Sequence, residues 1–272
     1  MPPRASRLRI TVIGASGRMG RAVIRSAAEF PELAIVAAVV SPMSEALGRD
    51  AGLLAGVPES GLSVTADLQD ALAGSDVAVD FSSAGALPAH IQACRQAQRA
   101  LLVGTTGHRA EAEAVLAAAA EEIPLLVAAN TSLGVAVLTE LVRAAAAALP
   151  PQFDIEIIEA HHRTKQDAPS GTALALGQVA GQARRRPNGV EGARSRSAGA
   201  RREGEIGFAS VRAGDLVGEH TVLFAGEGER LSLSHQATDR AVFARGALRA
   251  AAWLSLQPAG RYSMSDIVSI KS

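Results

Sequence analysis

The stretch Leu8–Gly20, LRITVIGASGRMG, contains the pattern that decides the fold class. Its first six residues form a short apolar run with β-branched side chains, which is typical of a buried strand. Glycines follow at the spacing Gly14-x-x-Gly17-x-x-Gly20, and a helical stretch then extends to about Phe30. The dinucleotide-binding fingerprint Gly-x-Gly-x-x-Gly has the same strand-turn-helix context, with one residue fewer between its first two glycines. We therefore predict a turn that holds a pyrophosphate at a helix N-terminus; a tight turn without a ligand is the alternative.

Outward from that stretch, apolar runs alternate with helical segments through the first half of the chain. The apolar runs are Ala34–Val40, Val77–Phe81, Leu101–Val103 and Leu125–Ala129. One of the helical segments between them is the Ala-rich stretch Arg109–Glu122. Near-continuous apolar strands separated by helices indicate strands buried on both faces, as in a parallel sheet. The predicted fold class is α/β, with a Rossmann-like doubly wound parallel sheet.

The second half of the chain has the pattern of an α+β domain. Its expected helices and strands are, in order, Gly134–Leu149, Phe153–Ala160, Ser170–Arg185, Ile206–Arg212, Glu219–Ala225, Arg230–Ala237 and Ala241–Leu256. Ser170 is the expected N-cap of its helix. The alternating polarity of the last three strands indicates an antiparallel sheet. We expect the final helix to pack on the first domain, so the predicted domains are residues 1–132 with 241–272, and residues 133–240.

The end of the second strand indicates which nicotinamide cofactor the chain prefers. An acidic residue there accepts hydrogen bonds from the ribose 2′-hydroxyl of NAD. Here the strand ends Val39-Val40-Ser41-Pro42, without a carboxylate. A 2′-phosphate therefore meets no repulsion, Ser41 is available to donate a hydrogen bond, and Arg18 is a nearby cation. We predict that NADP(H) binds at least as well as NAD(H).

Composition excludes several classes of protein. The 272 residues contain 27 Lys and Arg against 27 Asp and Glu, and zero net charge argues against a nucleic-acid partner. No apolar run is long enough to span a bilayer, and the single Cys94 excludes a disulfide framework. We expect a cytoplasmic protein. The segment Arg184–Glu203 contains seven arginines, and because no aromatic residue accompanies them we interpret it as a solvated loop rather than a nucleic-acid patch.

The segment Glu159–Thr172, EAHHRTKQDAPSGT, contains the richest chemistry of the chain. It joins a strand end to a helix start and contains the adjacent pair His161 and His162. It also holds Lys165, although Lys271 is the only other lysine of a chain that uses arginine elsewhere. Lysine can release a proton at its ammonium and arginine in practice cannot, so a retained lysine suggests acid-base use. A metal site is disfavoured because two adjacent histidines lack tetrahedral spacing, and a polar loop with incidental histidines is the other alternative.

The chain resembles the 4-hydroxy-tetrahydrodipicolinate reductase (dihydrodipicolinate reductase) family over essentially its whole length. The resemblance rests on the glycine loop, Asp80-Phe81-Ser82, Gly104-Thr105-Thr106-Gly107, Ala129-Asn130-Thr131-Ser132, the segment Glu159–Thr172 and Gly214–His220. It implies a Rossmann domain and a second domain that binds substrate and forms a homotetramer. It further implies reduction of a cyclic dicarboxylate by hydride transfer to C4, in diaminopimelate and lysine biosynthesis.

The resemblance also implies roles for individual residues. His161 and Lys165 would form the acid-base pair, with Lys165 as the proton donor. The implied substrate contacts are His162, Ser170, Gly171, Thr172 and Arg240. The implied cofactor contacts, together with Ser41, are Gly14, Ala15, Ser16, Gly17, Arg18, Met19, Gly104, Thr105, Thr106, Ala128, Ala129, Asn130 and Thr131. No metal is expected. An NAD(P)-dependent reductase of another small carboxylate, and a cofactor-binding sensor without catalysis, are the alternatives.

Overall fold

The residues that the computed structural model describes are 7–107, 110–185, 190–193 and 199–268. They form two compact units, of which the first contains residues up to Ser132 and Ala241–Ile267, and the second contains Leu133–Arg240. The two units are described separately below. None of the described helices is long and apolar enough to cross a membrane.

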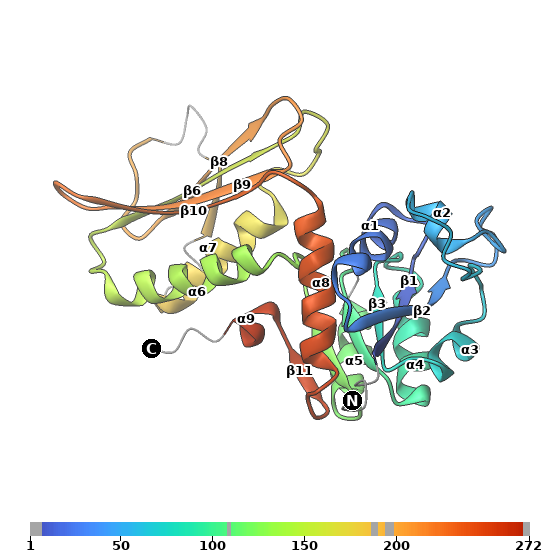
Figure 1. Cartoon of the computed structure of the whole chain (residues 1–272). Coiled ribbons are helices and arrows are strands. Elements are labelled where there is room, and N and C mark those ends of the chain that lie inside the picture. The colour runs from blue at the N-terminus through green and yellow to red at the C-terminus, as the bar shows by residue number, and fades with distance from the viewer. Residues whose placement is uncertain (1–6, 108–109, 186–189, 194–198, 269–272) are drawn as a thin grey trace, which may run out of the picture. The chain divides into compact units, whose positions relative to one another are not determined.

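A six-stranded sheet, parallel throughout, forms the centre of the first unit (Figure 1). Its strands, in sheet order, are β11 (Gly260–Tyr262), β5 (Pro124–Val127), β4 (Ala100–Val103), β3 (Val77–Asp80), β1 (Leu8–Ile13) and β2 (Leu33–Val39). The Rossmann-like parallel sheet predicted from the apolar runs is therefore confirmed. Strand β11 was not predicted, because Gly260-Arg261-Tyr262 is not an apolar run.

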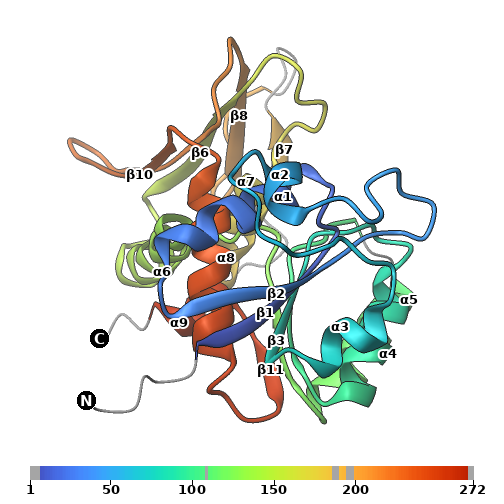
Figure 2. The same ribbon diagram turned by 45° about the vertical axis from the view of Figure 1, so that its right-hand side comes forward.

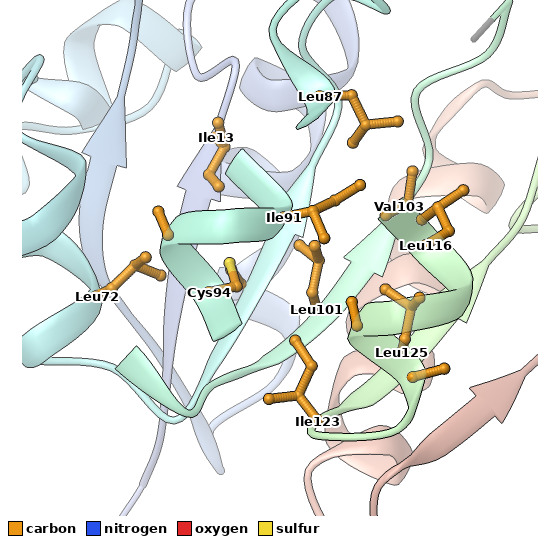
Figure 3. Close-up of a cluster of buried hydrophobic side chains, with 14 residues drawn as sticks. Ile13, Leu72, Leu87, Ile91, Cys94, Leu101, Val103, Leu116, Ile123 and Leu125 are labelled. Carbon is orange, nitrogen blue, oxygen red and sulfur yellow. The ribbon is translucent and has the colours of Figure 1, made fainter. Parts of the chain in front are cut away.

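Helices cover both faces of this sheet (Figure 2). One face is covered by α1 (Arg18–Ser26) and α8 (Ala241–Leu254), and the other by α3 (Leu68–Ala73), α4 (Leu87–Ala97) and α5 (Ala110–Ala120). The remaining short elements are η1 (Ala27–Glu29), α2 (Ala51–Ala55) and α9 (Met264–Ile267). A fully buried cluster that includes Leu72, Ile91, Leu101 and Leu116 fills the space between the sheet and α3–α5 (Figure 3). This three-layer arrangement explains why the strands are apolar on both faces.

The second unit consists of one five-stranded sheet with two helices on one face (Figure 1). Its elements are α6 (Leu133–Ala148), β6 (Asp154–His161), α7 (Gly171–Ala183), β7 (Val190–Ala193), β8 (Ile206–Arg212), β9 (Gly218–Ala225) and β10 (Arg230–Ala237). The strand order is β10-β9-β6-β8-β7. The core lies between α6, α7 and the inner face of the sheet, where Ile157, Phe208 and Phe224 are buried.

The structure corrects two predictions in this unit. The sheet is mixed rather than antiparallel: β6 pairs in parallel with β8, and β8 with β7, while β6–β9 and β9–β10 are antiparallel. The reason is that α7 returns the chain to the end of the sheet at which β6 began, so the next strand runs the same way. The segment Arg184–Glu203 is not simply a solvated loop, because it contains β7, and Arg201 pairs with Asp154 and Glu156. Residues 186–189 and 194–198 of that segment lie outside the described residues.

Candidate active site

The carboxyl edge of the parallel sheet collects the residues predicted to bind a cofactor. Gly14 directly follows β1, Gly104 follows β4 and Ala128 follows β5, while Ser41 lies two residues beyond β2. The other residues predicted around the cofactor lie in the glycine loop, at the start of α1 or after β4 and β5: Ala15, Ser16, Gly17, Arg18, Met19, Thr105, Thr106, Ala129, Asn130 and Thr131. Ligands of open α/β sheets bind outside this edge of the strands.

Two glycines of the loop are required by close backbone contacts. Gly14 has a φ of +81°, and a Cβ at this position would lie 2.6 Å from the carbonyl oxygen of Phe81. A Cβ at Gly20 would lie 2.2 Å from the carbonyl oxygen of Gly14, so α1 can begin this close to β1 only without a side chain there. Gly17 is the N-cap residue of α1, and in the described part of the chain no side chain caps this helix. Its first N–H groups are therefore available to an anion such as a pyrophosphate.

A cavity of about 210 Å³ adjoins the glycine loop. Gly14, Ser41, Ser82 and His90 are among the residues that line it. Ser41 is exposed, and its Oγ accepts a hydrogen bond from the Met43 N–H at 3.3 Å, which leaves the hydroxyl proton free to be donated. The cavity therefore lies where the adenosine side of a dinucleotide binds in this type of fold.

The buried carboxylate of Asp80 organises the end of β3 beside this cavity. One of its oxygens accepts hydrogen bonds from the Ser82 N–H at 2.8 Å and from Thr105 Oγ1 at 2.9 Å, and the other lies 2.8 Å from Nδ1 of His90. Asp80 is fully buried. Sequence reasoning assigned no role to Asp80 or His90, because His90 lies on α4 and only the fold brings it to the strand end.

On the inner face of the second sheet, polar and apolar residues are separated into rows that cross the strands. The two rows nearest the start of β6 are apolar and consist of Ile206, Ile155, Phe224, Leu231 and of Phe208, Ile157, Val222, Leu233. The next row is Ser210, Glu159, His220 and His235, and beyond it Arg212 lies opposite His161. The polar residues thus gather at the end of β6, next to the start of α7.

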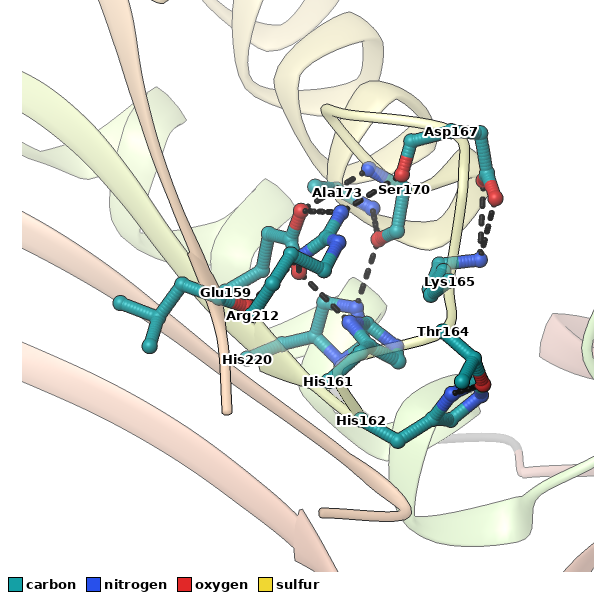
Figure 4. A network of polar contacts seen from close by, with 11 residues as sticks. Glu159, His161, His162, Thr164, Lys165, Asp167, Ser170, Ala173, Arg212 and His220 are labelled. Carbon is teal, nitrogen blue, oxygen red and sulfur yellow. Dashed lines mark hydrogen bonds and ion pairs between the residues drawn. The ribbon is translucent and has the colours of Figure 1, made fainter. Parts of the chain in front are cut away.

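Glu159, Arg212 and His161 form the centre of this polar region (Figure 4). Arg212 donates to both carboxylate oxygens of Glu159, at 2.7 and 2.8 Å, and Glu159 Oε2 lies 2.6 Å from Nδ1 of His161. Burial acts to raise the pKa of Glu159, but hydrogen bonds led by the one from Arg212 outweigh it and lower that pKa to about 2. Because Glu159 is ionised, His161 donates from Nδ1, which leaves Nε2 to carry or accept the exchangeable proton. Burial is the largest cause that lowers the pKa of His161, against the opposing effect of Glu159.

Ser170 joins the start of α7 to the same network. Its Oγ accepts a hydrogen bond from the Ala173 N–H at 3.2 Å, which confirms the predicted N-cap, and lies 3.0 Å from Nε2 of His220. The rings of His220 and His161 meet edge-on with centroids 5.2 Å apart. Burial, followed by the charge of His161, lowers the pKa of His220 to about 4. His220 is therefore neutral, and its buried Nδ1 has no hydrogen-bond partner among the described residues.

The other residues predicted to contact substrate lie near this network to different extents. Gly171 and Thr172 form the first turn of α7, directly after Ser170. His162 lies outside the buried network, and its Nδ1 is 2.7 Å from Thr164 Oγ1. Arg240 is exposed after β10 and makes no hydrogen bond or ion pair with the described residues of the network.

Lys165 is held by a carboxylate rather than by either histidine. Its Nζ donates to both carboxylate oxygens of Asp167, at 2.8 and 2.9 Å (Figure 4). Asp167 is well exposed, and the hydrogen bond from Lys165 is the largest cause that lowers its pKa. An exposed ion pair of this kind costs little to open, so the ammonium group can move to an arriving carboxylate. Among the described residues, no group of three or more His, Cys, Asp or Glu is arranged to hold a metal ion.

This region combines groups that can bind an anion with groups that can transfer a proton. The first turn of α7 supplies N–H groups, Lys165 supplies a mobile positive charge, and His161 has one ring nitrogen that Glu159 leaves free. Sequence reasoning found His161, Lys165 and Ser170 but missed Glu159, Arg212 and His220. The period of two along β6 places Glu159 on the same face as His161, and this was an available signal. Nothing local to the sequence connects Arg212 or His220 to β6.

The fold and these two sets of residues define an α/β protein of the dehydrogenase and reductase class, with a Rossmann-like unit and an α+β unit. A myo-inositol dehydrogenase from Corynebacterium glutamicum ATCC 13032 shares this fold at a TM-score of 0.58 and 17% identity, over 93% of this chain and 90% of that chain. Residues 8–131 match the family model described as dihydrodipicolinate reductase, N-terminus, and residues 134–268 match the one for its C-terminus. The chain therefore belongs to the dihydrodipicolinate reductase family and is an oxidoreductase.

Individual relatives resemble the chain over nearly its full length. The 4-hydroxy-tetrahydrodipicolinate reductase of Anaeromyxobacter dehalogenans (strain 2CP-1 / ATCC BAA-258) is 47% identical, over 97% of this chain and 98% of the relative. That of Alkalilimnicola ehrlichii (strain ATCC BAA-1101 / DSM 17681 / MLHE-1) is 50% identical, over 96% of this chain and 99% of the relative. The dipicolinate-bound dihydrodipicolinate reductase from Paenisporosarcina sp. TG-14 has a TM-score of 0.76 at 27% identity, covering 96% of this chain and 99% of that chain.

Proposed function

We propose that the protein reduces 4-hydroxy-tetrahydrodipicolinate, by way of dihydrodipicolinate, to tetrahydrodipicolinate in diaminopimelate and lysine biosynthesis. The observation that carries this proposal is the network at the end of β6, where His161 is bonded to Glu159 and Lys165 lies in the loop before α7. The curated relatives that match the chain end to end are named for this reaction.

The cofactor is NADPH or NADH, held by the first unit. The uncapped start of α1 and the two close-packed glycines of the loop fit a pyrophosphate, because no side chain intervenes between the backbone N–H groups and the ligand. When bound, the reduced nicotinamide supplies a hydride to C4 of the substrate ring. The absence of a carboxylate at Val40-Ser41-Pro42, with the free proton of the Ser41 hydroxyl, supports binding of NADPH at least as tight as that of NADH.

The substrate is a dicarboxylate, held by the second unit. The N–H groups of Gly171 and Thr172 in the first turn of α7 bind one carboxylate, and His162 and Ser170 lie beside that turn. Arg240 is the remaining cation proposed to contact the substrate. A solved relative of the same family is named as bound to dipicolinate, a planar dicarboxylate of the same ring type.

Lys165 donates the proton that completes the reduction. Its ammonium exchanges the Asp167 carboxylate for the substrate, releases a proton to the carbon next to C4 and is reprotonated from solvent. His161 acts with it as the second member of the acid-base pair, through Nε2. Positive charge on Lys165 and the dipole of α7 stabilise negative charge as it develops on the substrate.

Substrate-dependent oxidation of NADPH, followed by absorbance, tests this function. Turnover with 4-hydroxy-tetrahydrodipicolinate, and not with other small carboxylates, supports it. Turnover with another carboxylate alone indicates a different reductase, and NADPH binding without turnover of any substrate indicates a sensor. Dissociation constants of NADPH and NADH measured side by side test the cofactor assignment, and a strong preference for NADH contradicts it.

We also propose that the protein is a cytoplasmic homotetramer assembled through the second unit. The outer face of its sheet, opposite α6 and α7, carries exposed apolar side chains at Ile158 and Val211, which are 41% and 45% exposed. Large apolar side chains exposed on a sheet face favour association. In this assignment, residues 1–132 with 241–272 bind the cofactor, and residues 133–240 bind substrate and form the oligomer.

A further inference from the structure

Arg212 makes more contacts in the acid-base region than any role assigned so far requires. Its guanidinium donates to both oxygens of Glu159, to the backbone carbonyl of Asp167 at 2.6 Å and to that of Val211 at 2.7 Å. The side chain is 18% exposed and that of Glu159 is fully buried. One planar group thus joins three segments: β8, the end of β6 and the loop before α7.

We propose that Arg212 and Glu159 are positioning residues. They hold the two members of the acid-base pair, His161 and Lys165, in a fixed arrangement relative to each other. Arg212 acts on His161 through the Glu159 carboxylate, and on Lys165 through the backbone of Asp167. This inference rests on the proposed function, because it assumes that His161 and Lys165 act on the same substrate.

The His161 side of this link is a chain of short hydrogen bonds. Arg212 holds both oxygens of Glu159, and the same carboxylate accepts from Nδ1 of His161 and, at 3.2 Å, from the Ser170 N–H. The carboxylate can rotate only by giving up several of these bonds. The ring of His161 is thereby held with Nε2 pointing toward Gly218, where a Cβ would lie 3.1 Å from that nitrogen. A side chain at Gly218 would therefore crowd this nitrogen.

The Lys165 side of the link passes through a single residue. Asp167 binds Lys165 Nζ through its side chain and Arg212 through its backbone carbonyl. Because Arg212 belongs to β8, the backbone of Asp167 stays attached to that strand whether the ion pair is formed or open. When Lys165 leaves Asp167 for the substrate, the loop keeps its anchor. The distance between the lysine and His161 is therefore constrained by Arg212 and does not depend on the ion pair itself.

Only an arginine can make this set of contacts. Its guanidinium presents five N–H donors in a rigid plane, whereas the ammonium of a lysine is a point charge with three. Arg212→Lys keeps the positive charge next to Glu159 but cannot hold both carboxylate oxygens and the Asp167 carbonyl together. It therefore separates the positioning role from the effect of charge.

The first experiment compares steady-state kinetics of Arg212→Lys with those of a control, Arg9→Lys. Arg9 also binds a carboxylate with two guanidinium nitrogens, that of Asp76, but at the amino end of β1 in the first unit. We expect kcat of Arg212→Lys to fall by at least about 10-fold, since small displacements of reacting groups have large effects on rate. The KM for NADPH stays unchanged because the first unit binds the cofactor. A kcat equal to that of Arg9→Lys overturns the proposal.

The second experiment follows the titration of His161 in Glu159→Gln by NMR of its ring. The charged groups that face His161 are Glu159, Arg212 and Lys165, with the neutral ring of His220 at its edge. Glu159 is the one negative charge in this described set, and it raises the pKa of His161. Its neutralisation must move the titration of His161, and the pH limb of kcat/KM that follows it, to lower pH. An unmoved titration overturns the proposal, because it would show that the Glu159 carboxylate does not act on the His161 ring.

A double variant and the titration itself distinguish a failure of this inference from a failure of the proposed function. If Glu159→Gln does not fold because Arg212 is left with a buried charge, the double variant Glu159→Gln/Arg212→Gln removes both charges together. Its kcat should fall as in Arg212→Lys, and its His161 titration should move to lower pH by a smaller amount, because loss of the Arg212 charge by itself raises the pKa of His161. The titration does not depend on turnover. If the unchanged protein fails to oxidise NADPH with substrate, the proposed function fails, while the titration still decides whether Glu159 positions His161.

Discussion

At the residue scale, the adjacent histidines show how strand geometry separates two identical side chains. His161 ends β6 and faces the buried Glu159, while His162, the first residue beyond the strand, points away from it and lies 2.7 Å from Thr164 Oγ1 outside the network. His161 is 9% exposed. The same residue type is therefore suited to proton transfer at one position and to ligand contact at the next.

Lys165→Arg tests whether this lysine gives up a proton. The variant keeps the positive charge and the pairing with Asp167, but its guanidinium does not deprotonate. We expect kcat to fall by at least about 100-fold, the usual contribution of a positioned general acid. Stopped-flow oxidation of NADPH under single-turnover conditions measures the chemical step directly.

Lys271→Arg is the matched control, since it makes the same change at the other lysine. It should keep the turnover of the unchanged protein. Near-normal single-turnover rates for Lys165→Arg would show that charge alone is needed at this position.

The residues that sequence reasoning identified at the site are those that lie close together along the chain. His161, Lys165 and Ser170 lie within one short segment, from the end of β6 to the start of α7, whose composition alone was unusual. Arg212 and His220 reach the same region from β8 and β9, by strand register and not by any local pattern. Asp80 and His90 are a similar case, because a strand end and a helix are brought together by the fold.

At the element scale, the approach of α1 to β1 depends on the lack of a side chain at Gly20. Gly20→Ala places a methyl group on the carbonyl of Gly14 and must push the helix start away from the loop. We expect the dissociation constant of NADPH to rise by at least about 10-fold, because backbone N–H groups bind a pyrophosphate only at close range. Isothermal titration calorimetry gives this constant without turnover.

Gly74→Ala provides the comparison for that experiment. Gly74 follows α3 with helical dihedral angles, and the nearest atom to its added Cβ is 4.0 Å away. Its NADPH affinity should equal that of the unchanged protein. Equal affinities for both variants would mean that the glycine loop does not bind the pyrophosphate.

The pairing of β6 with β9 makes the second unit sensitive to acid. His220 has a pKa of about 4 in the folded state, below the value of about 6.5 for an unfolded histidine. Between these values the unfolded chain binds a proton that the folded chain does not, so stability falls as the pH drops from about 6.5 toward 4. The full effect is on the order of 3 kcal/mol.

Hydrogen exchange of the β6 and β9 amides at pH 7 and pH 5, corrected for intrinsic rates, measures this loss. His220→Gln keeps an acceptor for Ser170 but does not titrate, so the difference between the two pH values should shrink. An unchanged difference would assign the acid sensitivity to other groups.

Sequence periodicity identified most elements but not how all of them pair. Apolar runs of three to seven residues were enough for β1 to β5, since a strand buried on both faces needs no polar contrast. Alternation in β6, β8, β9 and β10 correctly indicated a sheet with one polar face. It could not indicate that β6 and β8 run in parallel, because alternation is the same in either direction and the connections between the strands decide the matter.

At the scale of the whole molecule, the exposed face of the second sheet is where association is expected. Ile158→Asp combined with Val211→Asp introduces two negative charges on that face. We expect the mass measured by light scattering to fall from about four times 27.9 kDa to a smaller species. Burying unpaired charges costs more free energy than the apolar contacts of such an interface contribute.

Leu53→Asp serves as the control for surface charge. Leu53 is 58% exposed on α2, in the first unit, and its replacement should leave the mass unchanged. A single-protomer mass for the unchanged protein would remove the tetramer proposal, and so would an unchanged mass for the double variant.

By itself, the sequence determined the class of fold, the family and the segment that contains His161 and Lys165. These properties depend on periodicity and on residues that lie near one another in the chain, and both can be read from the sequence. The tertiary structure decided that the second sheet is mixed, that Asp80 holds His90, and that Arg212 ties the end of β6 to the loop before α7. The contact between Glu159 and Arg212 joins residues 53 positions apart, and like the others it arises from strand register and crossover direction. Such pairings follow from how elements pack and not from any element's own composition.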